Sequence, residues 1–295
     1  MTKELVIISG KGGTGKTCIT ASFGYLSKSK VMADCDVDAA DLHIILQPRI
    51  EEEQEFRGGE KAVIDPYKCV KCGLCVEVCR YEAITEDLTV DGFSCEGCSV
   101  CYHVCPEQAI TMEESLNGHW FVSQSRFGPM VHAALLPGEE NSGKLVALVR
   151  NQAKALAKRL AKELVVVDGA PGIGCPVISS ITGADHVMVV TEPSLSGLHD
   201  MQRVIGLIRT FNIPITVVIN KFDINIDVWS KIEQWLDQNS VNLGGKIPYD
   251  PNVIKSMVMK KTVVESGNGP ANNSIRQLWD YMSTHALRME TSHGF

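Results

Sequence analysis

The sequence predicts a doubly wound α/β fold in which an inserted α+β segment interrupts a mostly parallel sheet. Three observations lead to this prediction. Short apolar runs alternate with amphipathic stretches, a glycine-rich loop follows the first run, and a cysteine-rich stretch separates the second run from the third. Apolar runs of this length are typical of strands that are buried on both faces, as in a parallel sheet.

Five apolar runs are the core strands that we expect, at residues 5–8, 31–33, 164–167, 186–190 and 215–219. Amphipathic stretches lie between them, such as 144–162, and are expected to form helices that cover the sheet. Ligands of such sheets bind beyond the carboxyl ends of the strands. The residues that follow each run are therefore the candidate site.

The loop after the first strand matches the pattern G-x-x-x-x-G-K-[ST] in full, from Gly10 through Lys11, Gly12, Gly13, Thr14, Gly15 and Lys16 to Thr17. Its glycines allow backbone amides to point at phosphate oxygens. Lys16 is expected to reach the β- and γ-phosphates, and the Thr17 hydroxyl to coordinate Mg²⁺. A strand before the loop and a helix after it favour an ATP site over a chance match. We count Cys18 with the nucleotide-binding residues and expect it, like Cys35, to pack as a small buried residue.

Eight of the eleven cysteines form two copies of the spacing C-x2-C-x2-C-x3-C, and the second copy begins 26 residues after the first (from Cys69 to Cys95). This spacing is that of a bacterial two-cluster ferredoxin, in which the fourth cysteine of each run ligates the other cluster. We therefore expect two 4Fe-4S clusters, one held by Cys69, Cys72, Cys75 and Cys105, and the other by Cys95, Cys98, Cys101 and Cys79.

A pair of four-cysteine zinc sites is the alternative for this region. Zinc sites place two cysteine pairs far apart and do not need runs of four, so the spacing favours iron and sulfide. Arg80 stands where a proline usually follows the fourth cysteine, and Pro106 keeps that proline. The change in composition places a ferredoxin-like domain at 58–114, inserted into an ATPase domain formed by 1–57 and 115–295.

Composition excludes several classes of protein. The net charge is −7 and an acidic run lies at 51–55, so nucleic acid is not an expected partner. No apolar stretch reaches the roughly 20 residues that a membrane span requires, and the chain starts without a signal-peptide pattern. We therefore expect a cytoplasmic protein without a membrane partner.

The phosphate loop, with its early Lys11, resembles the deviant Walker A motif of the MinD/Mrp/nitrogenase iron-protein superfamily of P-loop ATPases. The resemblance covers about 230 residues outside the insert, and the arrangement is similar to superfamily members that carry an inserted ferredoxin domain. It implies that Lys11 crosses a nucleotide-sandwiched homodimer to touch the ATP of the partner. The chain is then expected to dimerise on ATP.

Other site residues come from the same resemblance. Asp36 resembles the second-strand aspartate that positions or deprotonates the attacking water, with Asp34 or Asp38 as alternatives. Asp168 resembles the Walker B aspartate, which holds a water on Mg²⁺. Asn220 resembles the asparagine that contacts adenine. Residues 248–251 are expected beside the base, or to be only a turn.

Two further sequence features can be compared with those of superfamily members. Cys175 stands seven residues after Asp168, the offset at which the nitrogenase iron protein carries a ligand of its dimer-bridging cluster, but a second ligand cysteine is missing, so we expect a buried cysteine of the switch segment. The stretch 274–288 carries an apolar stripe of Ile275, Leu278, Trp279 and Met282 with few basic residues. Core packing is expected for this stripe and not a membrane-binding helix.

Together these features predict an ATP-hydrolysing, homodimeric redox protein whose cofactors are ATP, Mg²⁺ and two 4Fe-4S clusters. ATP-driven closure of the dimer would gate or drive low-potential electron transfer to a protein partner. The alternative is a scaffold or maturation factor that passes a metal or an iron-sulfur cluster to a client metalloprotein. A third possibility is a regulator in which the clusters only sense redox state.

Overall fold

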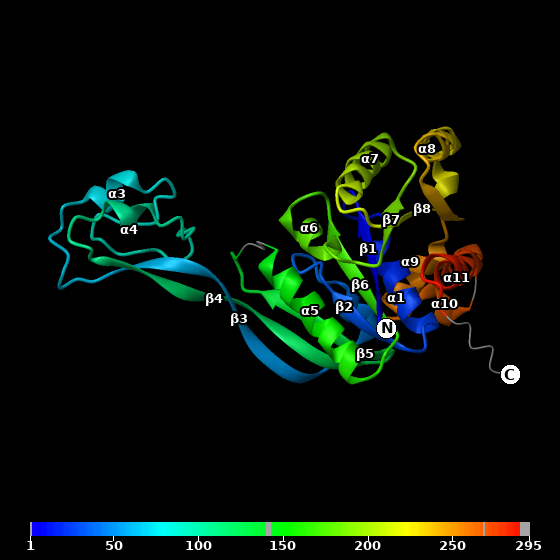
Figure 1. Cartoon of the computed structure of the whole chain (residues 1–295), viewed down its shortest axis with the longest axis horizontal. Coiled ribbons are helices and arrows are strands. Elements are labelled where there is room, and N and C mark those ends of the chain that lie inside the picture. Colours follow the sequence, from blue (N-terminus) through cyan, green and yellow to red (C-terminus); the bar gives the residue numbers. More distant parts are fainter. Residues whose placement is uncertain (1, 140–142, 268, 290–295) are drawn as a thin grey trace. The chain divides into compact units, whose positions relative to one another are not determined.

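The computed structural model describes residues 2–139, 143–267 and 269–289 (Figure 1). The chain divides into two compact units. The first, which we call the core unit, comprises Met1–Glu53, Trp120–Ala134 and Asn141–Phe295, and the second, the insert unit, comprises Gln54–His119 and Leu135–Glu140. The boundaries predicted from composition, 58 and 114, fall inside the limits of the insert unit.

Within the described residues, nine strands form one sheet in the order β3-β4-β5-β2-β6-β1-β7-β8-β9. The strands are β1 (Lys3–Ser9), β2 (Lys30–Asp34), β3 (Arg49–Ile64), β4 (Ile110–Ser125), β5 (Gly128–Leu135), β6 (Leu164–Pro171), β7 (His186–Thr191), β8 (Ile215–Asn220) and β9 (Asn242–Ile247). In the part of this order from β5 through β2, β6, β1, β7 and β8 to β9, every pair of neighbouring strands is parallel. The α/β fold with a largely parallel sheet is confirmed, and all five predicted runs are strands.

The sequence did not predict β5, which lies between β2 and β6 along the chain and pairs with β2 through Met32 and Met130. The insert unit has segments on both sides of the core part of this strand, Gln54–His119 before it and Leu135–Glu140 after it. This strand was not predicted because Pro129 and His132 interrupt its apolar run. Its sequence therefore does not have the pattern of a buried strand.

Helices cover both faces of the core sheet (Figure 1). One layer contains α5 (Lys144–Arg159), α6 (Cys175–Ile181), α7 (Leu195–Arg209) and α8 (Ile226–Gln238). The other contains α1 (Lys16–Leu26), α2 (Leu42–Leu46), α9 (Pro251–Val258), α10 (Val263–Ser266) and α11 (Pro270–Tyr281). A 3-10 turn, η1 (Phe222–Ile224), follows β8, and a π-helical turn, η2 (Met282–Ala286), continues α11.

The apolar stripe near the C-terminus belongs to the core, as predicted. Ile275, Leu278 and Met282 are at most 2% exposed and share a buried cluster with Phe23 of α1. The ring of Trp279 lies 5.0 Å from that of Phe23. Among the residues that the structure describes, no helix is long and apolar enough to cross a membrane.

The insert unit contains two short helices, α3 (Leu74–Val78) and α4 (Val100–Val104), and each carries one cysteine of the repeat, Cys75 or Cys101. Its small core contains Ala62, Ile84 and Ile110, with several cysteines packed against them. An antiparallel bridge joins Ile84 to Val90. A core of this size buries little apolar surface, so the unit depends on other interactions for its stability.

Candidate functional site

The phosphate loop connects β1 to α1 at the carboxyl edge of the sheet. Gly15 precedes the first residue of α1 with φ 93°, and a Cβ atom there would lie 2.3 Å from Asn220 Nδ2. Only glycine combines this left-handed backbone with so close a neighbour. The Asn220 amide in turn donates to the Thr14 carbonyl at 2.7 Å. The loop is thus held by β8 as well as by its own helix.

Lys16 lies at the centre of the site and is only 6% exposed. Its Nζ lies 2.9 Å from Asp168 Oδ1 and 3.1 Å from Asp36 Oδ2. Burial alone would lower the pKa of Lys16, but the carboxylates of Asp168 and Asp36 outweigh it and hold the pKa above its ordinary value. Lys16 is therefore charged and ready to bind an anion.

The three candidate aspartates after β2 lie in different environments. Asp34 is 1% exposed and pairs in register with Asp168, so burial, with Asp168 beside it, raises its pKa well above the ordinary range. Asp36 is 8% exposed, and Asp38 is exposed. Burial also raises the pKa of Asp36, although Lys16 opposes this shift. Of these three aspartates, Asp36 both contacts Lys16 and lines the pocket around the phosphate loop that is described next.

A pocket of about 1280 Å³, part of it open to solvent, surrounds the phosphate loop. The predicted residues that line it are Gly12, Gly13, Thr14, Gly15, Lys16, Thr17, Cys18, Asp36, Asn220, Pro248, Tyr249 and Asp250. Residues 248–250 thus lie at the pocket, and Asp250 also caps α9 through the backbone of Asn252. Sequence reasoning missed the apolar wall formed by Ile254 and Met257 of α9, because nothing in the motif signals a residue so distant in sequence.

Other contacts of the site were not predicted. Thr20 donates a hydrogen bond to Asp168 Oδ1 at 3.0 Å, and its spacing of four residues from Lys16 could have indicated this. Lys11 Nζ lies 2.6 Å from Glu192 Oε1 and within hydrogen-bonding distance of Ser194 and Ser196. No sequence signal connects Lys11 with these residues, which lie between the end of β7 and the first turn of α7.

The three cysteines outside the repeat differ in how far they are exposed to solvent. Cys35 is fully buried, as predicted, but Cys18 is half-buried at the nucleotide pocket, and burial raises the pKa of its thiol to about 11. The prediction that Cys175 is buried is wrong, because its side chain is exposed at the start of α6. The buried face of α6 passes through Val177 and Ser180, and residues two apart on a helix point in different directions.

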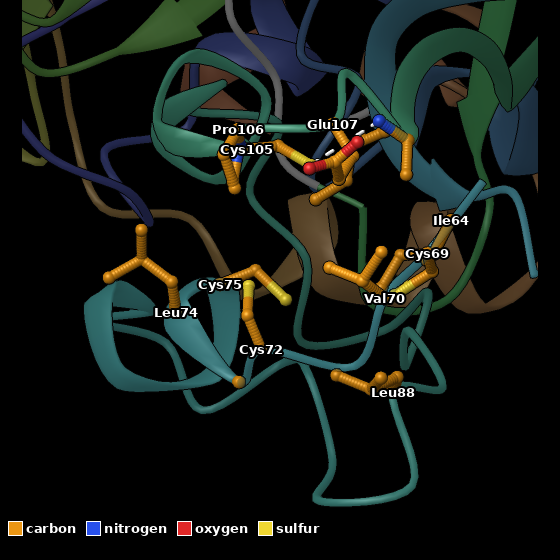
Figure 2. A pocket seen from close by; sticks show the side chains of 13 residues that line it. Ile64, Cys69, Val70, Cys72, Leu74, Cys75, Leu88, Cys105, Pro106 and Glu107 are labelled. Atoms are coloured by element: carbon orange, nitrogen blue, oxygen red, sulfur yellow. Dashed lines mark hydrogen bonds between the residues drawn. The ribbon is translucent and has the colours of Figure 1, made fainter.

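The cysteines of the insert unit surround two hollows of about 360 and 300 Å³, both partly open to solvent. Cys69, Cys72, Cys75 and Cys105 line the first, as Figure 2 shows, and Cys79, Cys95, Cys98 and Cys101 line the second. Each hollow therefore takes three cysteines from one run and the fourth from the other. Within the described ranges, no three Cys, His, Asp or Glu side chains converge as a single-ion site.

The two runs repeat in three dimensions as well as in sequence. The amide of Ala83 donates to Cys79 Sγ at 3.4 Å, and that of Ala109, 26 residues later, donates to Cys105 Sγ at 3.3 Å. Asp65 and Asp91 each accept a hydrogen bond from the amide two residues ahead, at 2.9 and 3.0 Å. Each run therefore presents a backbone amide to the sulfur of its fourth cysteine.

Comparison with known proteins places this geometry in a family. One uncharacterized protein of Methanocaldococcus jannaschii is 32% identical to the chain over 94% of this chain and 95% of its own length. The septum site-determining protein MinD of Bacillus subtilis is 26% identical over 87% of this chain and 80% of its own. The structure of the Mg-ADP complex of MinD from Pyrococcus horikoshii has a TM-score of 0.60 at 16% identity, covering 98% of this chain and all of that one, which shows a shared fold. Because residues 5–263 also match the family described as the CobQ/CobB/MinD/ParA nucleotide binding domain, the chain belongs to that family.

Proposed function

We propose that this MinD/ParA-type nucleotide-binding ATPase is an iron-sulfur protein that couples ATP-driven dimerisation to electron transfer. Membership of the family supports ATP binding and hydrolysis. The two four-cysteine hollows of the insert unit are the observation that carries the redox part.

The roles of the core residues follow from their contacts. Lys16 binds the β- and γ-phosphates once the nucleotide displaces its contacts with Asp36 and Asp168. Thr17 and Asp168 would hold Mg²⁺, and Asp36, freed from Lys16, positions the attacking water. Asn220 and residues 248–250 contact the base.

Lys11 supplies the link between two copies of the chain. Its ammonium is bound by Glu192 in the structure and is half-buried. In the proposed closed homodimer it leaves Glu192 and contacts the ATP of the partner, so that the dimer forms only with triphosphate. The loop after Asp168 responds to the γ-phosphate, as such loops do in related nucleotide switches.

Each hollow would hold one 4Fe-4S cluster through its four thiolates, and a bound cluster supplies one-electron chemistry at low potential. Cys72 and Cys98 are exposed, so each site has one ligand near the surface, where a redox partner could approach. Nucleotide-driven closure of the dimer then gates transfer to that partner.

Electron delivery measured in three nucleotide states tests this function. Anaerobically purified, reduced protein should pass electrons to a one-electron acceptor at different rates with a non-hydrolysable ATP analogue, with ADP and without nucleotide. Equal rates in all three states would rule out gating. Zinc in place of iron and sulfide would rule out the redox function altogether.

A scaffold or maturation role is the second candidate, and the exposure of Cys72 and Cys98 also favours it, because exposed ligands ease cluster release. The two functions differ in cluster lability. A carrier keeps its iron through repeated redox cycles in the presence of a chelator, whereas a scaffold loses it to the chelator or to an apo-metalloprotein.

A further inference from the structure

Residues 66–72 of the insert unit, which we call the first loop, expose an aromatic and an apolar side chain beside the first hollow. Tyr67 is 98% exposed and Val70 is 62% exposed. Val70 and Cys72 also line the first hollow, where Figure 2 labels both. A protein that covered Tyr67 and Val70 would therefore lie against the space that the four thiols surround.

The first loop is basic in a unit that is otherwise acidic. Residues 54–119 and 135–140 contain 14 Asp and Glu but only five Lys and Arg, and two of these five are Lys68 and Lys71. Both lysines are exposed. Lys68 Nζ lies 3.8 Å from Asp65 Oδ2, but exposed pairs of this kind are weak and are readily exchanged for another carboxylate.

The cysteine repeat shows that these side chains are not required by the ligand spacing. The first loop corresponds to residues 92–98, the second loop, and the two differ at three positions, where Lys68, Val70 and Lys71 are replaced by Ser94, Glu96 and Gly97. Lys71 and Gly97 both have a left-handed backbone, with φ 59° and 64°. Glycine adopts this conformation without strain and lysine does not. The fold alone would therefore favour glycine at both positions.

The second loop presents a different surface. A Cβ atom at Gly97 would lie 2.2 Å from the carbonyl oxygen of Glu60, and Lys61 donates a hydrogen bond to the carbonyl of Gly92, so this loop packs closely on β3. Its exposed charged residue is Glu96, which lines the second hollow. An acidic surface that is attracted to the first loop is therefore repelled by the second.

The number of cations favours a protein as the molecule that covers the first loop. Anionic membranes are bound by clusters of about four to eight Lys and Arg, and nucleic acids by phosphate contacts of roughly that number or more. Two lysines in an acidic unit are too few for either. A protein interface needs only a few matched charges around an apolar or aromatic centre.

We propose that the first loop is the docking site of an acidic redox protein, whose carboxylates face Lys68 and Lys71 and whose apolar contact covers Tyr67. The proposal rests on the redox function given above and adds the class of partner and the hollow that faces it. One electron would leave the first hollow and reduce the partner, with no bond made or broken. Because Glu107 also lines this hollow, the carboxylates of the partner must lie opposite the lysines.

Zero-length cross-linking locates the docking site on the anaerobically purified, iron-loaded full chain. A carbodiimide joins a lysine amine to a carboxylate, and the probes are a small acidic flavodoxin and, for comparison, a basic c-type cytochrome. We expect Lys68 and Lys71 to be the main lysines joined to the flavodoxin, and neither to be joined to the cytochrome. Absence of flavodoxin from both lysines, or cross-links mainly at exposed core lysines such as Lys28 and Lys231, overturns the proposal.

Charge reversal tests the role of the two lysines. Lys68→Glu with Lys71→Glu should slow electron transfer from the reduced chain to the flavodoxin by about tenfold or more at low ionic strength, the lower end of electrostatic steering. Lys28→Glu with Lys231→Glu changes the net charge equally and should leave the rate unchanged. Iron and sulfide content should be unchanged in both. An equal loss of rate in the two double variants would assign the effect to net charge and overturn the proposal.

The aromatic contact has a matched control in the repeat, because Phe93 corresponds to Tyr67 and is 80% exposed. Tyr67→Ala should weaken flavodoxin binding, measured by calorimetry, by about fivefold or more, as truncation of an important interface residue does. Phe93→Ala should bind like the wild type. Equal affinities of the two variants overturn the proposal.

Two further measurements separate the possible causes of failure. If the reduced wild type passes no electron to a neutral benzoquinone, the redox function itself is wrong. If it reduces the quinone but the lysine and tyrosine variants behave like the wild type with the flavodoxin, only the docking site is wrong. Binding of the chain to phosphatidylserine vesicles that is lost in the Lys68 and Lys71 double variant would identify a membrane as the ligand and overturn docking of a protein.

Discussion

Lys16 Nζ lies 2.9 Å from Asp168 Oδ1, so the lysine proposed to bind phosphate and the carboxylate proposed to bind Mg²⁺ form an ion pair with each other. The pair is almost fully buried, and a buried charge without a partner is costly. In the proposed function, Mg²⁺ and ATP would supply each residue with a new partner of opposite charge.

Asp36→Asn should reduce the rate of ATP hydrolysis by about 10²-fold or more, because a residue that positions or deprotonates water contributes roughly that much. ATP binding should persist, since Asp36 does not contact the phosphate loop backbone. Steady-state hydrolysis and equilibrium binding measure the two effects. Asp38→Asn is the control, because Asp38 is exposed. A larger loss of hydrolysis in Asp38→Asn would move the role to that residue.

Gly15→Ala should weaken ATP binding by at least about tenfold and destabilise the chain by about 1–3 kcal/mol. The added methyl group clashes with Asn220 Nδ2 and strains a backbone at φ 93°. Urea unfolding and nucleotide titration test this. Gly206→Ala, at an exposed position of α7 with no atom within 4 Å of the new Cβ, should be neutral or stabilising by up to about 1 kcal/mol.

Two double variants test the exchange of the fourth cysteine between the runs. Cys69→Ala with Cys105→Ala removes two residues of the first hollow only, so about four of roughly eight irons should remain. Cys69→Ala with Cys79→Ala removes one residue from each hollow and should lose nearly all iron. Iron and sulfide analysis measures both. The opposite ranking would show that each run binds its own cluster.

Lys11→Ala should still bind ATP but should fail to form the ATP-dependent dimer, because the proposed contact across the dimer is lost. Light scattering after size-exclusion chromatography with a non-hydrolysable analogue measures the mass. Lys28→Ala, at an exposed position beyond α1, should dimerise like the wild type. Dimerisation of the Lys11 variant at wild-type nucleotide concentrations contradicts the role assigned to Lys11.

The core unit should lose stability as the pH falls from about 6.5 to about 4. Burial lowers the pKa of His132 and of His186 from 6.5 to about 4, so in this window the unfolded chain binds protons that the folded chain does not. The stability is therefore complete above pH 6.5 and declines below it. His186→Gln should reduce the slope of the unfolding free energy by about 1.4 kcal/mol per pH unit. Urea titrations followed by tryptophan fluorescence measure the slope, and an unchanged slope would show that His186 is not responsible.

Local patterns in the sequence were enough to predict several structural elements of this protein. The five core strands, the phosphate loop and the 26-residue cysteine repeat could be predicted, because burial on both faces and a fixed ligand spacing leave a pattern in neighbouring residues. The apolar stripe that ends in Met282 was likewise assigned correctly to the core.

Tertiary structure alone decided the contacts between residues that are distant in sequence. Lys11 meets Glu192, Met257 reaches the nucleotide pocket, and Lys61 meets Glu139 across 78 residues of chain. The exposure of Cys175 was decided in the same way, by the face that α6 turns to its neighbours. Such contacts depend on how the elements pack, and a long-range pair leaves no periodic pattern around either of its members.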